Sequence, residues 1–228
     1  MKNTDQEDDM QLTLPEELFL LTLDEERGTV VESTGHLQRY GIAGAILAEL
    51  ALAGRVSIDA RKRLALLETP QGGDPIFDLA VAAIQEIARP HKFTYWVQRL
   101  GKKTFRQGIS DSLIAKGALA RQEKRYLWVV PFPDSATLRA SAKYAVKLRL
   151  REAVLVDSPP DSRTLILLNL VKACQLFPLV FTKDERAIAK RRIQELEKAR
   201  TIDDLLRETL QEIETATLAV VMSSTTFL

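Results

Sequence analysis

Apolar side chains recur along this chain at the three- and four-residue spacing of helices, and short apolar runs interrupt that pattern in two places. A helix is predicted after Thr13-Leu14-Pro15-Glu16, where a threonine and a glutamate three residues apart form a capping box. Residues 41–53 carry only one charge, Glu49, so a helix there is apolar around most of its circumference and belongs inside a bundle. A second apolar central helix is predicted over residues 161–175.

Further helices follow the same spacing in both halves of the chain. Their predicted ranges are 76–87, 93–100, 104–116, 135–156, 183–200 and 203–220. The segments QGGDP and FPLVF are predicted to be loops, and DSPPDS ends a helix. Because no flexible linker separates the two halves, we predict one mainly α-helical domain, a single bundle over residues 12–228, preceded by a disordered acidic tail over residues 1–11.

Two β-hairpins are predicted, each directly after a helix that ends at a glycine, Gly54 or Gly117, in the left-handed conformation of a helix cap. In the first hairpin, residues 56–58 and 64–67 flank the basic turn DARKR. In the second, Ala118-Leu119 pairs with YLWVV across the turn ARQEKR. The YLWVV strand does not alternate polar and apolar residues, so it is either buried on both faces or projects as an apolar tip.

Composition narrows the function classes. The 228 residues carry a formal net charge of +1, so attraction to a polyanion must come from local clusters of cations. The single cysteine excludes an internal disulfide, and its apolar surroundings favour a buried side chain over a nucleophile. His36 and His91 have no metal-ligand spacing, and the acidic start is not a secretory signal. We therefore expect a soluble protein without a metal or cofactor.

Cations do gather locally. The dense groups are Arg61, Lys62, Arg63; Arg99, Lys102, Lys103, Arg106; and Arg121, Lys124, Arg125. Lys103 and Arg106 lie three residues apart near a helix start, so both face the same way beside free amides and can hold a phosphate. Lys124 and Arg125 precede an aromatic and apolar run, a mixture typical of a membrane interface. That run is Tyr126, Leu127, Trp128 and Val129.

Five segments, in this order and at this spacing, resemble the Golgi phosphoprotein 3 family. They are LTLPEELFLLTLDEERG, GIAGAILAELALAGRVSID, DPIFDLAVAAIQE, YWVQRL and LIAKGALARQEKRYLW. The resemblance runs from Leu12 to Val220 and implies a mostly helical, non-enzymatic protein with a pocket for the phosphatidylinositol 4-phosphate headgroup. It also implies a protruding apolar hairpin for membrane insertion or self-association, and protein tails as further partners. The chain resembles a divergent or bacterial member.

The resemblance retains the family's pocket in part. Lys103 and Arg106 stand where the family has two arginines, so both charges are kept. Thr34 stands near the position of a family tryptophan and Ala43 at that of a further arginine, so a ring and one cation are missing. Residues close enough in sequence to replace them are Arg39, Tyr40 and His36. The run from Tyr126 to Val129 falls at the family's apolar hairpin tip.

We therefore predict a cytoplasmic, peripherally membrane-associated protein, on the cytosolic face of the Golgi in a eukaryotic cell. Its ligand is an anionic phospholipid, and it forms a homo-oligomer through the hairpin. The alternative is a lipid-independent adaptor or self-assembling module that uses the hairpin as a protein contact. Winged-helix DNA-binding modules share the helix-then-hairpin layout, but the first helix lacks the polar side chains that read bases, so no nucleic-acid partner is expected. The sequence shows no recognisable pair of a nucleophile and a base, so we do not expect an enzyme.

Overall fold

The computed structural model of this protein describes residues 11–24, 34–67, 73–121, 136–138, 140–156, 160–199 and 203–225. Within these ranges the predicted mainly helical architecture with two short antiparallel sheets is confirmed. The elements are α1 (Leu14–Leu21), α2 (Gly35–Leu52), β1 (Val56–Ile58), β2 (Leu64–Leu66), α3 (Pro75–Gln85), α4 (Phe93–Leu100), α5 (Lys103–Ala115), β3 (Leu119–Arg121), β4 (Ala136–Leu138), α6 (Ala140–Leu155), α7 (Ser162–Ala173), α8 (Phe177–Val180), α9 (Glu185–Ala199) and α10 (Asp204–Thr225).

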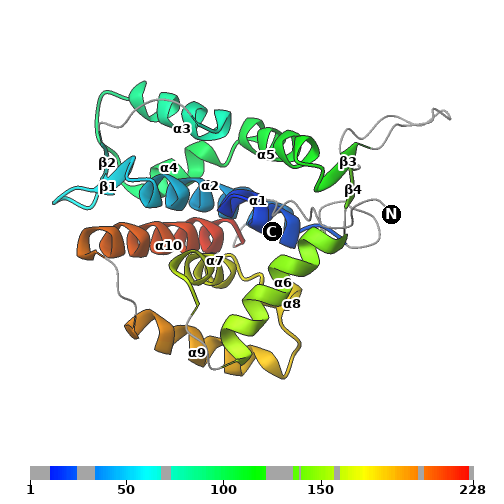
Figure 1. The fold of residues 1–228 in the computed structure, drawn as a ribbon. Helices are drawn as coiled ribbons and strands as arrows, with labels where there is room; N and C mark the ends of the chain where they lie inside the picture. Colours follow the sequence, from blue (N-terminus) through cyan, green and yellow to red (C-terminus); the bar gives the residue numbers. More distant parts are fainter. Residues whose placement is uncertain are drawn as a thin grey trace, which may run out of the picture.

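The helices are arranged in three layers (Figure 1). α1, α2 and α10 cross the middle of the molecule, α3, α4 and α5 lie on one side, and α6 to α9 lie on the other, with α7 against α10. The two sheets stand at opposite ends of the molecule. β1 and β2 lie beside the end of α2, and β3 and β4 lie beyond α5 and α6.

α2 is the central helix, because almost all of its side chains are apolar and buried. Glycines bring its neighbours close to its backbone: a Cβ on Gly41 would lie 2.7 Å from Sγ of Cys174, and one on Gly44 would lie 2.3 Å from Oγ1 of Thr217. The C-terminal end of α7 and the second half of α10 therefore pack directly against α2. Even so, no helix in the described part of the chain has the length and hydropathy of a membrane span.

Helix ends follow the signals in the sequence. Gly54 and Gly117 adopt left-handed conformations, with φ of 66° and 72°, at the two predicted caps. The side chains of Asp74 and Asp161 cap α3 and α7, accepting hydrogen bonds of 2.9 and 2.6 Å from amides of the first turn. The first hairpin pairs as predicted, with Val56 opposite Leu66.

The second hairpin has a different partner strand from the predicted one. β3 pairs with β4, with Leu119 opposite Leu138 and Arg121 opposite Ala136, so YLWVV is not its partner. The prediction was wrong because Ala136–Leu138 has the composition of a helix start, and only its pairing with β3 makes it a strand. Residues 122–135, which include all six predicted hairpin residues from Lys124 to Val129, lie outside the described residues.

Several helix boundaries and one predicted loop also differ from the prediction. α2 begins at Gly35, six residues before its predicted start, and α10 continues to Thr225. FPLVF is not a loop, because Phe177–Val180 forms the short helix α8. Pro178 fits there, since the amides of a first helical turn need no intrahelical partner. The predicted acidic tail, apart from Gln11, lies outside the described residues.

Candidate anion-binding site

The candidate site is formed where α2 meets the start of α5. α4 ends at Leu100 and α5 begins at Lys103, with Gly101 between them. Nε of Arg39, on α2, donates a hydrogen bond to the carbonyl oxygen of Gly101. The structure therefore brings Arg39 and Tyr40 to the turn that precedes Lys103.

Gly101 provides the space for this contact. A Cβ at this position would lie 3.1 Å from Cδ1 of Tyr40, 3.3 Å from Cγ of Arg39 and 3.0 Å from the carbonyl oxygen of Val97. Each of these separations is tighter than ordinary van der Waals contact, so a side chain at position 101 would displace the side chains of Arg39 and Tyr40 by a few tenths of an ångström. The sequence analysis missed Gly101. Its position after the last apolar residue of a helix indicates a cap, but nothing indicates a contact 62 residues away.

α5 begins without a side-chain cap. Its N-cap residue is Lys102, whose side chain makes no capping hydrogen bond, and its first turn carries no acidic residue. α3 and α7, by contrast, begin at an aspartate that caps them. The first amides of α5 and the positive end of its dipole are thus left available for an anion at the position of Lys103.

Lys103 and Arg106 lie one turn apart on α5, the first exposed and the second half-buried. Among the described residues, neither forms an ion pair. Phe105, between them, is 5% exposed and packs into the core, so it holds this turn in place while the cations stay at the surface. Cζ of the exposed Arg39 lies 5.1 Å from the centroid of the Tyr40 ring.

The two positions that lack the family's ring and cation are buried. Thr34, just ahead of α2, is 6% exposed, and Ala43 is 0% exposed. Neither presents a group to a ligand at the surface. Apart from His36, whose side chain is outside the described part of the structure, Arg39 is the one basic residue in α2.

The structure describes the base of the second hairpin, β3 and β4, and the predicted apolar tip lies outside the described residues. β3 follows the C-terminal end of α5, whereas Lys103 stands at the N-terminal end of the same helix. The thirteen residues of α5 span about 20 Å at 1.5 Å per residue. The cations and the base of the second hairpin are therefore separated by the length of α5 (Figure 1).

Two further features lie away from these cations. Cys174 is fully buried, and burial raises the pKa of its thiol to about 12, so it forms no thiolate at neutral pH. A cavity of about 360 Å³ lies among α7, α9 and α10. Its charged side chains balance in sign, and Lys172 pairs with Glu197 at 3.0 Å, so it does not favour an anion.

The chain is similar to proteins of one known family. The family model described as Golgi phosphoprotein 3 (GPP34) matches residues 14–215. Vacuolar protein sorting-associated protein 74 of Eremothecium gossypii is 27% identical over 161 residues, which cover 61% of this chain and 48% of that protein. The chain thus spans about half the length of this curated relative. The matched family range contains both α2 and α5, and with them Arg39, Lys103 and Arg106.

Proposed function

This chain belongs to the Golgi phosphoprotein 3 family, and from that premise we propose that it is a peripheral membrane protein that binds an anionic lipid headgroup at the start of α5. The family is Golgi-associated and non-enzymatic. One observation carries the proposal: the hydrogen bond from Arg39 to Gly101 puts a cation of α2 beside the uncapped end of α5 that carries Lys103 and Arg106.

The chemistry of this site suits a phosphate group. Arg39 uses Nε for the Gly101 carbonyl, so its two terminal nitrogens remain available to donate to phosphate oxygens. Lys103 and Arg106 supply further charge-assisted donors, and the first amides of α5 supply neutral ones. Each exposed cation near an anionic surface contributes about 1 kcal/mol.

Phosphatidylinositol 4-phosphate is the headgroup that the family relationship favours. Thr34 and Ala43 remove an aromatic ring and one cation from the family's pocket, and Arg39 with Tyr40 compensates in part. We expect selectivity for this headgroup over other anionic lipids to be modest and attraction to anionic membranes in general to be retained.

We infer an orientation on the membrane from the same geometry. The cations and the base of the second hairpin are at opposite ends of α5, so a flat surface engages both when α5 lies along it. Tyr126, Leu127 and Trp128 would then enter the interface, where aromatic side chains are favoured.

Vesicle flotation tests the charge contribution. We expect the full chain to float with phosphatidylcholine vesicles that contain phosphatidylserine or phosphatidylinositol 4-phosphate, and not with phosphatidylcholine alone. Replacing Lys103 and Arg106 by Gln removes about 2 kcal/mol of attraction, so binding should fall about 30-fold. The control replaces two exposed cations on the α9 side of the molecule, Lys183 and Arg191, by Gln and should bind normally. Equal binding to neutral and anionic vesicles would reject the proposal.

The hairpin contribution is tested by Trp128→Asp. Under the membrane proposal this change lowers vesicle binding and leaves the sedimentation coefficient in solution unchanged. If vesicle binding is kept and an oligomer becomes a monomer, the hairpin is a contact between protein copies and the lipid-independent alternative is supported.

A further inference from the structure

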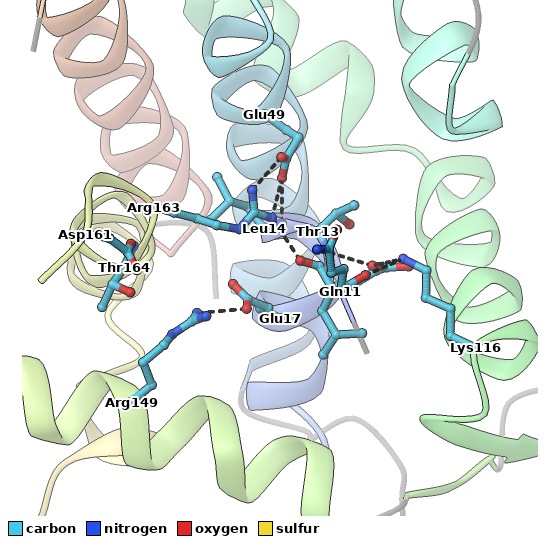
Figure 2. Close-up of polar contacts among 12 residues, drawn as sticks. Gln11, Thr13, Leu14, Glu17, Glu49, Lys116, Arg149, Asp161, Arg163 and Thr164 are labelled. Atoms are coloured by element: carbon cyan, nitrogen blue, oxygen red, sulfur yellow. Dashed lines mark hydrogen bonds and ion pairs between the residues drawn. The ribbon is translucent and has the colours of Figure 1, made fainter. Parts of the chain in front are cut away.

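Two adjacent carboxylates on α1, Glu16 and Glu17, are almost completely buried, at 0% and 3% exposure. Figure 2 shows this region. Glu16 accepts hydrogen bonds of 2.7 Å from both Nζ of Lys116 and Oγ of Ser112, at the end of α5. The adjacent carboxylate of Glu17 accepts one of 2.8 Å from Arg149, on α6. The two acids therefore bind two different helices.

The start of α1 is itself fixed to the body of the molecule. The backbone of four successive residues, 11–14, is bound by charged side chains (Figure 2). Lys116 donates to the carbonyl of residue 11 at 3.1 Å and Arg163 to that of residue 12 at 2.9 Å. Carboxylates of Glu16 and Glu49 accept from the amides of residues 13 and 14 at 2.6 and 2.7 Å. The start of α1 is thus held in place by hydrogen bonds to several other helices.

Both chain segments that flank the second hairpin form hydrogen bonds with α1 or with the residues just beyond it. Lys116 lies three residues before β3, and α6 starts directly after β4. Near the start of α6, Nζ of Lys143 donates to the carbonyl oxygen of Leu23, just beyond α1. Together with the Arg149–Glu17 pair, this contact holds α6 against α1. The segment entering the hairpin and the segment leaving it are bound to one eight-residue helix.

α5 is held at both ends. Arg39 holds the turn before it, and Glu16 holds Ser112 and Lys116 in its last turns. If the contacts of Glu16 are lost, the end of α5 that carries β3 loses these polar contacts and keeps its apolar packing, while the end that carries Lys103 keeps the contact with Arg39. The angle between the cations and the hairpin can then change.

We propose that Glu16 and Glu17 are positioning residues that set the spacing of α5 and α6, and with it the direction of the β3–β4 hairpin relative to Lys103 and Arg106. The effect on membrane binding rests on the function proposed above. The effect on the spacing of the helices rests on the α1 contacts and does not require that function.

Electron paramagnetic resonance distances test the spacing directly. Spin labels at Ala115→Cys, at the end of α5 that Glu16 binds, and at Tyr144→Cys on α6 sit at exposed positions, and the native Cys174 is buried and does not react. Removing one partner of a buried ion pair leaves an uncompensated charge, so both partners are replaced together. The variants are Glu16→Gln with Lys116→Met, and Glu17→Gln with Arg149→Met.

We expect a shifted or broadened distance distribution in both double variants, with the helical circular dichroism unchanged. The matched control, Glu195→Gln with Arg191→Met, removes an exposed pair on α9 and should keep the original distribution. An unchanged distribution in both double variants overturns the proposal. If neither folds, Ser112→Ala decides, because it removes one hydrogen bond to Glu16 and no charge: a broader distribution supports the proposal, and the original one overturns it.

Flotation of the same variants separates this inference from the proposed function. With the cations of α5 intact, we expect binding to anionic vesicles to fall about tenfold, the equivalent of one lost charge-assisted contact. If the distances change but the unmodified chain binds no anionic vesicle, the positioning role stands and the proposed function fails. If the unmodified chain binds anionic vesicles and the distances do not change in the variants, the proposed function stands and the positioning role fails.

Discussion

Glu17 and Glu185 show how the same side chain responds to opposite surroundings. Burial raises the pKa of Glu17 above 4.5, and the cations Arg149 and Arg163 only partly oppose this increase. At Glu185 the pKa is lowered, first by a hydrogen bond of 2.9 Å from the backbone N–H of Thr182 and then by Arg151. Relative to its ordinary value, the pKa of Glu17 is therefore raised and that of Glu185 lowered by the folded protein.

The two acids should give opposite pH dependences of stability. A raised pKa means that the folded state of Glu17 binds more protons than the unfolded state, so its contribution is fully present below pH 4.5 and is lost as the pH rises through the raised value. Relative to Glu17→Gln, the unmodified protein should lose free energy of unfolding as the pH rises above 4.5. Urea unfolding across a pH series measures this difference.

Glu185→Gln is the matched control with the opposite sign. Its lowered pKa contributes stability above pH 4.5 that is lost as the pH falls through the lowered value. A Glu17→Gln difference that does not vary between mildly acidic and neutral pH would show that the burial of Glu17 has no effect on its protonation.

These residue-level properties could be predicted only in part. The capping role of Glu16 follows from its spacing to Thr13, and the 2.6 Å hydrogen bond from Thr13 N–H confirms it. Its burial could not be predicted, because an acid in a first helical turn is ordinarily solvated and its partner Lys116 lies 100 residues away. The position of Arg39 was predicted from proximity along the chain, but its partner Gly101 was not.

At the level of elements, local signals were sufficient for most helices. Phe93–Leu100 has the predicted bounds, and Gly54 and Gly117 end their helices as expected. The partner of β3 was not predictable, because strand pairing joins residues across a long connection and the aromatic YLWVV has the higher strand propensity. The local sequence pattern does not indicate which distant residues a strand will pair with.

Gly44 is the element-level test, because α10 depends on close approach to α2 there. In an open helix, replacing glycine by alanine would stabilise by up to about 1 kcal/mol. Here the new Cβ would lie 2.3 Å from Oγ1 of Thr217, which is held by its own hydrogen bond to Ile213. We expect Gly44→Ala to lower the free energy of unfolding by about 1–3 kcal/mol, measured by urea denaturation.

Gly35→Ala is the control for this prediction. Gly35 begins the same helix, and a Cβ there would have no neighbour within 4 Å. It should leave stability unchanged or raise it slightly. Equal effects of the two substitutions would show that α10 does not require the small residue at position 44.

For the whole molecule, the described core is one connected cluster that includes side chains from all three layers and from both α1 and α10. α10 contacts α2, α4 and α7, so the last helix completes the packing of the earlier ones. We therefore predict that the chain unfolds in a single cooperative step.

Trp96, 1% exposed on α4, reports on this prediction. Because the chain has two tryptophans, Trp128→Phe leaves Trp96 as the sole tryptophan. Its fluorescence and the helical circular dichroism should change with the same urea midpoint, since a two-state transition gives coincident curves for different probes. Separate midpoints would divide the chain into independently folding parts.

The Arg39–Gly101 hydrogen bond has a mechanical consequence. If a lipid headgroup binds at the start of α5 as proposed, it also binds to the central helix, because Arg39 of α2 is joined to the preceding turn at that carbonyl oxygen. Force on the lipid contact is then transmitted to the interior along α2 as well as through the turn. Under lateral drag, the headgroup should slip from its donors before the helices part, so the protein would leave the bilayer still folded.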